Sequence, residues 1–419
     1  MFDSITLPSG LRVVGEKLTH VRSCTVGVWV KVGSMNEAPE ENGLSHFIEH
    51  MVFKGTQNRS ARDIAEEMDM VGGQLNAFTS KECTCYYAKV TDDELRTAVD
   101  VLADLALRPV FDEGELNKER GVVLEEIAMV EDTPDDLVHE LLSDAQYDGS
   151  LRYPILGTNE LIRSYSREDL VRYWSRHYTP GNMVLAISGN YDWQAFLALV
   201  ETFFDTFPNA DGEETPFAPQ HFVSGRKARA KETEQLQICL GFPGVESNSD
   251  EIYPLSVLSN ALGGGMSSRL FQRIREELGM AYSVYTYASS YRGVGSFTVY
   301  AGTSPENGET VIRELREQME RFLRDGMTEK EFRSAKAQLR GGFLLGLESS
   351  SGRMQSLGRG VLLFGKTRTP EETLQKIDAV TMEDVMALAR RLLSAQPSAA
   401  IVGRDAQRYL EYIGGALRG

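Results

Sequence analysis

Two histidines and a glutamate stand close together in the segment that reads NGLSHFIEHM. His46 and His50 are four residues apart, so on a helix both imidazoles lie on one face, and Glu49 lies on the same arc. Asn42 or Ser45 is a suitable N-cap for this helix. Because two nitrogen ligands one turn apart suit a zinc ion, the segment predicts metal-assisted hydrolysis. An ordinary helix with two hydrogen-bonded histidines is the alternative.

A catalytic zinc ion needs a third protein ligand, and a later helical segment, ELNKERGVVLEEIAMVED, offers one. Glu119 and Glu126 fall within its apolar stripe, where burial of two carboxylates is costly unless a cation meets them. Glu125 lies about 100° away from the stripe and is expected to be solvated. We therefore predict that Glu126 is the ligand and that Glu119 orients His50 or the site water. A solvated acidic helix face is the alternative.

The order His-x-x-Glu-His is a known zinc peptidase signature. In this arrangement we expect His46, His50 and Glu126 to hold one Zn²⁺ per chain. Glu49 is then the general base, which takes a proton from the attacking water and later delivers it to the leaving amine.

The chain is organised as two similar halves. Its 419 residues are more than a single domain with one hydrophobic core usually contains. A proline-rich and acidic stretch predicts a linker at 211–224, between a zinc-binding catalytic domain at 1–210 and a non-zinc domain at 225–419. Strands and helices recur in both halves at a nearly constant offset, although chance similarity of α/β units is the alternative. We predict an α+β fold with two duplicated domains of about 210 residues, each a mostly antiparallel sheet layered with helices.

The second half also serves as an internal comparison for the predicted metal site. When the repeats are aligned, Val257, Asn260 and Ala261 stand opposite His46, Glu49 and His50. Ala335 and Gly342 stand opposite Glu119 and Glu126. The second copy keeps the framework but lacks every proposed metal group, which favours a functional origin for those groups in the first half.

Charge and composition disfavour several classes of partner. With 61 acidic and 44 basic side chains the formal charge is −17, which disfavours nucleic acid and anionic membranes. The cysteines have no spacing typical of a disulfide framework and are expected to be free thiols: Cys24, Cys83, Cys85 and Cys239. No signal peptide and no long apolar run is evident, so we expect a cytoplasmic protein.

The sequence resembles the pitrilysin, insulysin and mitochondrial processing peptidase family of inverted-motif zinc peptidases. The resemblance covers nearly the whole chain and includes HFIEHMVFKGT, GGQLNAFTSKE, ERGVVLEEI, YTPGNMVLAISGN and SSRLFQRIREELGMAYSVY. The length matches the short, two-domain branch, which includes processing proteases of bacterial type. Glu126 stands at the family's spacing for the distal glutamate ligand.

The resemblance also implies further site residues and a partner. Arg275 and Tyr282 match an arginine and a tyrosine that hold the substrate from the non-zinc domain. Because both sets of groups lie on one chain, the resemblance favours a homodimer with a composite active site. A peptide is expected to bind as an added strand along Asn76, Ala77 and Phe78, with Phe47 as a further substrate contact. A plain sheet edge, a surface arginine and a core tyrosine are the alternatives.

These expectations together predict a zinc metalloendopeptidase that cleaves extended peptides or unfolded segments inside a chamber. A catalytically silent assembly or scaffold subunit of the same fold is the principal alternative. A metal-dependent hydrolase that acts on non-peptide bonds is a third interpretation.

Overall fold

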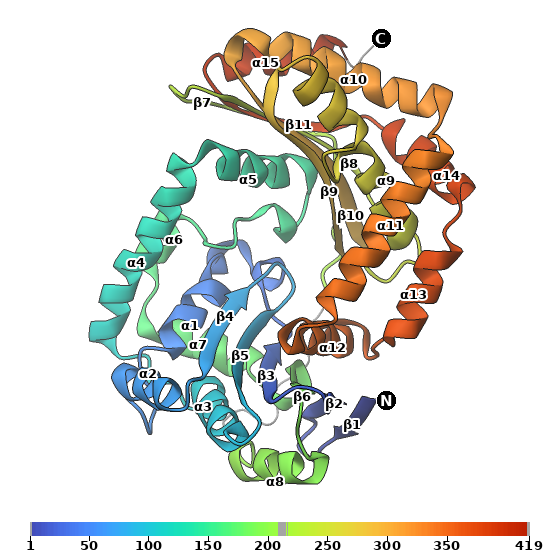
Figure 1. Cartoon of the computed structure of the whole chain (residues 1–419). Coiled ribbons are helices and arrows are strands. Elements are labelled where there is room, and N and C mark those ends of the chain that lie inside the picture. Colours follow the sequence, from blue (N-terminus) through green and yellow to red (C-terminus); the bar gives the residue numbers. More distant parts are fainter. Residues whose placement is uncertain (1, 208–214, 216, 417–419) are drawn as a thin grey trace. The chain divides into compact units, whose positions relative to one another are not determined.

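The computed structural model describes residues 2–207, 215 and 217–416 of the chain, which form two compact units (Figure 1). Unit 1 consists of Met1–Ile127, Tyr153–Ala218 and Leu344–Thr369. Unit 2 consists of Ala128–Arg152, Pro219–Phe343 and Pro370–Gly419. Each unit therefore contains a segment from the opposite half of the sequence.

Within the described residues, unit 1 is built on a six-stranded sheet with the order β1-β2-β6-β3-β5-β4. Only the β2–β6 pair is parallel, and the other neighbours are antiparallel. Successive side chains of strand β3 point to opposite faces of the sheet, and nearly all of them are buried because both faces are covered. The strands are β1 (Phe2–Thr6), β2 (Arg12–Lys17), β3 (Ser23–Val30), β4 (Gln74–Thr79), β5 (Thr84–Thr91) and β6 (Met183–Gly189).

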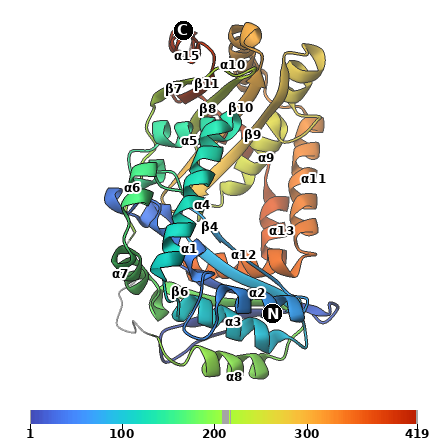
Figure 2. The ribbon, with the colours of Figure 1, turned by 90° about the vertical axis from the view of Figure 1, so that its left-hand side faces the viewer.

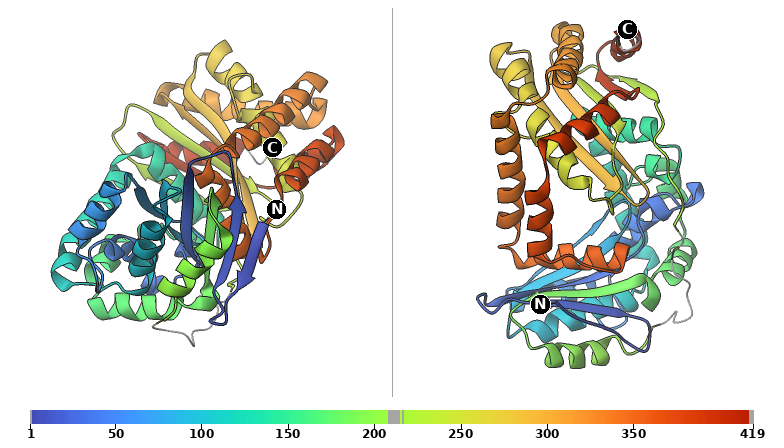
Figure 3. Two further views of the ribbon diagram at one scale, coloured as in Figure 1. Left: turned by 60° about the horizontal axis from the view of Figure 1, so that its bottom comes forward. Right: turned by 90° about the vertical axis from the view of Figure 1, so that its right-hand side faces the viewer.

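Helices cover both faces of this sheet. Val26, Val28 and Leu185 face the main core with α1 (Leu44–Val52) and other helices of the first half. These others are α2 (Ala61–Met70), α3 (Leu95–Leu107), the first part of α4 (Glu113–Asp132), α6 (Asn159–Ser164), α7 (Arg167–His177) and α8 (Trp193–Phe203). Trp29 and Val184 face the other way, against α12 (Ser350–Phe364), which Figure 3 shows in orange beside the blue and green strands.

Unit 2 is built on a five-stranded sheet with the order β7-β11-β8-β10-β9 among the described strands. Its β7–β11 pair is parallel and its other pairs are antiparallel. This pattern repeats the β2-β6-β3-β5-β4 part of the first sheet strand for strand. The strands are β7 (Arg226–Ala230), β8 (Leu236–Pro243), β9 (Ala281–Tyr291), β10 (Val294–Thr303) and β11 (Ser398–Gly403).

The second sheet is also covered on both faces. Cys239, Tyr300 and Val402 pack against α5 (Pro134–Gln146), which comes from the first half of the sequence. Ile238 and Leu240 point the opposite way, into the larger core of the unit. Its remaining helices are α9 (Ile252–Gly263), α10 (Gly308–Asp325), most of α11 (Glu329–Gly346), α13 (Pro370–Ala379), α14 (Met382–Leu393) and α15 (Ala406–Ala416).

The predicted α+β class with two repeated, mostly antiparallel sheets is confirmed. The compact units differ from a division along the sequence, because the apolar faces of α5 and α12 pack on the sheet of the other half. The predicted linker 211–224 falls partly outside the described residues, and its described part from 219 to 224 belongs to unit 2.

Two other sequence predictions concern the whole chain. The four cysteines are free, as predicted, and the structure also shows that they are buried. Among the described residues, no helix combines the length and the apolar character that crossing a bilayer requires.

Candidate metal centre

Helix α1 carries both histidines and is held at its start by a carboxylate from an earlier loop. Glu37 is only 3% exposed, and its Oε1 accepts a hydrogen bond from the backbone N–H of Ser45 at 2.8 Å. Its Oε2 accepts from the backbone N–H of Gly43 at 2.8 Å and from Nδ2 of Asn42 at 3.0 Å. The prediction that Asn42 or Ser45 caps the helix is therefore wrong, because Gly43 is the N-cap and Glu37 satisfies the free N–H groups.

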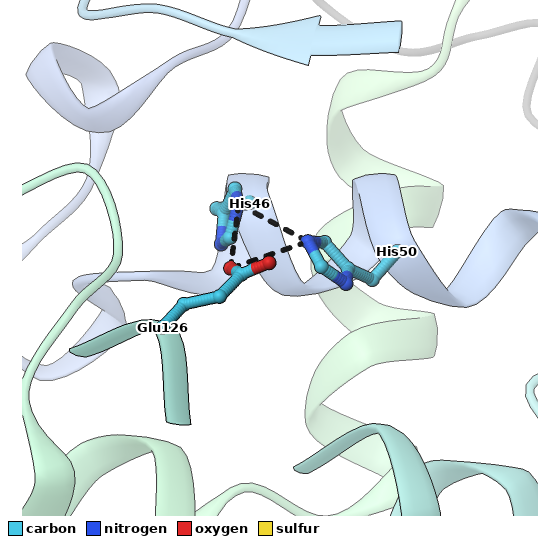
Figure 4. A group of neighbouring side chains, drawn as sticks. All are labelled: His46, His50 and Glu126. Carbon is cyan, nitrogen blue, oxygen red and sulfur yellow. Dashed lines mark hydrogen bonds and ion pairs between the residues drawn. The ribbon is translucent and has the colours of Figure 1, made fainter. Parts of the chain in front are cut away.

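Three potential ligand atoms converge between α1 and α4. Nε2 of His46 lies 3.2 Å from Nε2 of His50. Oε2 of Glu126 lies 3.6 Å from each of these nitrogens. Figure 4 shows the two rings and the carboxylate pointing toward one another, and the three residues form a group whose ligand atoms all lie within 4.8 Å.

These separations fit a zinc ion. Zinc–nitrogen and zinc–oxygen bonds of about 2.0–2.1 Å place tetrahedral ligand atoms about 3.3–3.4 Å apart, which is close to the three distances found. Burial, helped by the charge of His50, lowers the pKa of His46 to about 3, so this imidazole is neutral at ordinary pH and has a lone pair to offer. The donor set of two imidazoles and one carboxylate is that of a catalytic zinc site.

The side chains around His50 fix its orientation. Nδ1 of His50 lies 2.8 Å from Oε1 of Glu119, so it donates its proton there and leaves Nε2 for a metal. Nζ of Lys54 lies 2.7 Å from the other oxygen of Glu119. By contrast, Nδ1 of His46 is buried and has no hydrogen-bond partner among the described residues. Only one of the two imidazoles is thus oriented by a second side chain.

The buried face of α4 is the face that the apolar stripe in its sequence predicts. Leu116, Val123 and Ile127 are buried in the core of unit 1. Glu119 is 5% exposed and the side chain of Glu126 is 32% exposed, whereas Glu125 lies on the exposed surface. Figure 2 shows α4 beside α1, consistent with the contacts of Glu119 and Glu126 with the histidines. The structure therefore brings Glu119 and Glu126, but not Glu125, to the histidines.

A hydrogen bond to Glu49 connects helix α1 to the edge strand β4. The hydroxyl of Thr79 donates to Oε2 of Glu49 at 2.5 Å. Burial raises the pKa of the Glu49 carboxyl above its ordinary value, and the hydrogen bond from Thr79 opposes that rise. A raised pKa suits a group that must take up a proton and give it back near neutral pH.

Strand β4 is the last strand of its sheet and pairs only with β5 among the described strands. Asn76 is exposed, while Ala77 and Phe78 are partly exposed. The ring of Phe78 packs against Trp29, with 5.7 Å between the ring centroids. One edge of β4 thus has backbone groups that no other described strand pairs, close to Glu49.

The prediction that Phe47 contacts a substrate is wrong for this structure. Its side chain is 0% exposed and packs within the main core of unit 1. The guanidinium of Arg120 lies over its ring, 5.8 Å from the centroid. Phe47 follows His46 directly, so it points about 100° away from the imidazole around the helix and into the core.

Arg275 and Tyr282 belong to unit 2, where they lie side by side. Arg275 is on the π-helix η5 (Phe271–Glu277), and Tyr282 is near the start of β9. The guanidinium carbon of Arg275 lies 5.3 Å from the centroid of the Tyr282 ring, which is 73% exposed. The predicted pair is thus brought together and is accessible.

Sequence reasoning missed three residues around the site. Thr79 lies within the segment GGQLNAFTSKE that carries part of the family resemblance, but nothing in its position indicated Glu49 as its partner. Lys54 follows His50 by four residues, and this helical spacing could have indicated a neighbour on the same side. Glu37 precedes the helix by seven residues, and no local capping pattern indicated it.

Comparison with known protein families matches the two halves of the chain separately. Residues 12–159 match the family described as Insulinase (Peptidase family M16). Residues 164–339 match the family described as Peptidase M16 inactive domain. The match to an inactive domain accords with the absence of the metal-binding residue types at the corresponding positions of the second half.

Individual relatives resemble the chain over nearly its full length. The uncharacterized zinc protease YmxG of Bacillus subtilis is 46% identical over 403 residues, which is 96% of this chain and 98% of the relative. An uncharacterized zinc protease of Streptomyces coelicolor is 40% identical, over 95% of this chain and 88% of the relative.

Solved structures show the same fold. A protease from Helicobacter pylori superposes with a TM-score of 0.91 at 23% identity, covering 96% of this chain and 99% of that chain. A peptidase M16 inactive domain from Pseudomonas fluorescens superposes with a TM-score of 0.89 at 18% identity, covering 96% and 98%.

Proposed function

Because the chain belongs to the M16 family of peptidases, we propose that it is a zinc-dependent endopeptidase that cleaves extended peptides or unfolded segments. The observation that carries this proposal is the convergence of His46, His50 and Glu126 on one point, with Glu49 on the next face of the same helix. Two nitrogen donors and one carboxylate are the set of three protein ligands that is typical of catalytic zinc sites, which also bind a water.

Each residue then has a distinct role in hydrolysis. His46, His50 and Glu126 would hold a zinc ion, which would act as a Lewis acid and lower the pKa of a bound water. Oε1 or Oε2 of Glu49 accepts the proton of the attacking water and delivers it to the leaving amine, while Thr79 holds the carboxylate in position. Glu119 keeps the Nδ1 proton of His50 in place, so that Nε2 remains a donor toward the metal.

Substrate binding involves both units in this proposal. The free edge of β4 pairs with the peptide backbone along Asn76, Ala77 and Phe78, which gives affinity with little sequence choice. Arg275 and Tyr282 of the non-zinc unit hold the substrate carbonyl and the oxyanion. We further propose a cytoplasmic homodimer, in which the composite site lies within a chamber that admits unfolded segments.

A catalytically silent assembly subunit is the alternative that the sequence left open. Such a subunit has no need of the metal ligands or the general base. In this chain the three proposed ligands lie close together, Glu119 contacts His50, and Thr79 contacts the general base Glu49. This arrangement supports the enzyme over the silent subunit.

The substitution Glu49→Gln tests the proposal. It removes the proton acceptor but none of the three proposed ligands, so the variant is expected to retain one zinc ion per chain and lose cleavage of quenched fluorescent peptides. Glu66→Gln, on the exposed face of α2, is the matched control and is expected to behave like the wild type. Persistent cleavage by Glu49→Gln excludes Glu49 as the base. A wild-type protein that binds no zinc and cleaves no peptide would instead support the silent subunit.

A further inference from the structure

Unit 2 contains an open pocket of about 390 Å³ beside Arg275 and Tyr282. Its wall also includes the start of β9, the end of β10 and the residues that follow β10. The volume lies within the range of pockets that bind small ligands or side chains, about 300–1,000 Å³. No aspartate or glutamate is among the residues that line it.

Arg275 is the cation of this pocket, and it has no acidic partner among the described residues. Its guanidinium lies between two aromatic rings, 4.8 Å from the centroid of Phe271 and 5.3 Å from that of Tyr282. Its neighbour Arg273, by contrast, is paired with Glu277 and Glu314. The two rings hold the guanidinium in place, but they do not neutralise its charge.

Neutral polar side chains surround this charge. Ser304 and Asn307 line the pocket, and neither side chain makes a capping hydrogen bond to the helix that follows it. The amide oxygen of Gln235 accepts only a long hydrogen bond, 3.4 Å from Nε2 of Gln237. The pocket thus offers one unpaired cation with uncharged hydrogen-bond donors, in a chain whose formal charge is −17.

We propose that this pocket binds a carboxylate group of the peptide substrate, carried by an acidic side chain or by the free C-terminus. A carboxylate matches the fork of Arg275 and neutralises its charge with two of the five guanidinium N–H donors, which leaves other donors and the Tyr282 hydroxyl for the substrate carbonyl. Because the chain as a whole has a formal charge of −17, an arginine without an acidic partner offers an anionic group a local attraction that the net charge does not. The proposal rests on the peptidase function proposed above and assigns it a preference for substrates with a carboxylate.

A peptide series tests the proposal and separates the two sources of the carboxylate. The parent is an uncharged, C-terminally amidated peptide that the enzyme cleaves. In one arm each position in turn carries Glu, and this peptide is compared with the one that carries Gln at the same position. In the other arm the C-terminus is a free acid instead of an amide. We expect at least one carboxylate position in one arm to raise kcat/KM about tenfold or more, the range of a charge-assisted hydrogen bond. Cleavage of the parent with no gain in either arm overturns the pocket proposal and leaves the peptidase proposal intact.

A charge placed in the pocket provides the matching protein test. Asn307→Asp adds a carboxylate at the N-cap of α10, a position where Asp is favoured, so the fold is expected to be retained. It should lower the ratio of kcat/KM for the acidic peptide to that for the parent by about tenfold or more. Gln375→Glu adds the same charge on exposed α13 outside the pocket, and it should leave that ratio unchanged.

Ser304→Asp is a second variant of the pocket, with the same expected fall in the ratio. If both pocket variants keep the wild-type preference for the acidic peptide, or if Gln375→Glu lowers the ratio as much as they do, the pocket does not bind the carboxylate.

Discussion

The two imidazoles of the proposed metal centre differ in what surrounds them. His50 donates from Nδ1 to Glu119, and Glu119 is itself held by Lys54. His46 has no such partner within the described residues and depends on its buried position alone. Because outer partners fix the orientation and the basicity of a metal ligand, we expect Glu119 to control the affinity of His50 for a metal.

The substitution Glu119→Gln tests this control. It keeps the shape of the side chain but removes its charge and weakens the hydrogen bond to Nδ1 of His50. We expect zinc affinity to fall about 10–100-fold, as is typical when an outer partner of a histidine ligand is lost. Competition with a chromophoric chelator measures the affinity. Glu115→Gln, one turn earlier on α4 and paired only with Lys118, is the control. An equal affinity in both variants contradicts the role of Glu119.

Among the elements, α1 depends most on what precedes it. The helix has only nine residues, and its N-cap, Gly43, has a φ of 97°, a conformation that glycine adopts readily. Its first N–H groups are satisfied by the buried carboxylate of Glu37 rather than by a flanking side chain. Burial raises the pKa of Glu37, against the hydrogen bonds that lower it. One loop carboxylate therefore sets the position of the helix that carries both histidines.

We expect Glu37→Gln to destabilise the protein by about 1–3 kcal/mol, because a buried N–H group loses a charged acceptor. Urea unfolding in the presence of a chelator measures the free energy of unfolding without a contribution from metal. Zinc affinity should fall as well, since α1 carries two of the three proposed ligands. Glu40→Gln, at an exposed position of the short 3₁₀ helix Pro39–Glu41, is the control. If Glu37→Gln is as stable as this control, the carboxylate does not hold the helix.

The sequence predicted these elements well where periodicity governs them. Helical spacing placed His46 and His50 on one face, and the apolar stripe of α4 distinguished Glu126 from Glu125. Spacing alone did not show that Phe47 points into the core, because an apolar residue beside a site fits either role. Nor did it indicate Glu37, whose hydrogen bonds depend on how a loop folds back over the helix start.

At the scale of the whole molecule, each compact unit contains a helix from the opposite half of the sequence. Helix α5 covers one face of the unit 2 sheet, and α12 covers one face of the unit 1 sheet, although each helix comes from the opposite half of the chain. The packing of α12 depends on contacts between residues more than 300 positions apart, such as Trp29 Nε1 and Met354 Sδ at 3.3 Å. No local pattern in the sequence encodes a pairing at this distance.

A methyl group at Gly358 tests how closely α12 fits its sheet. A Cβ at this position would lie 2.2 Å from Nε1 of the buried Trp29 ring, which has little room to move. We expect Gly358→Ala to destabilise the protein by about 1–3 kcal/mol through overpacking, measured by urea unfolding. Gly341→Ala on α11, where no atom lies within 4 Å of an added Cβ, should be neutral or stabilising. Equal stability of the two variants contradicts the close packing of α12.

The central claim is that His46, His50 and Glu126 hold one metal ion, and zinc binding by a matched pair of variants tests it most directly. Wild-type protein and Glu125→Gln should each bind one zinc ion per chain with equal affinity. Glu126→Gln should bind zinc at least about 100-fold more weakly. This is the upper end of the loss in affinity that is typical when an outer partner of a ligand is removed, because here a ligand itself is removed. If Glu126→Gln binds zinc like the wild type, or if Glu125→Gln is the variant that loses it, the proposed metal centre is wrong.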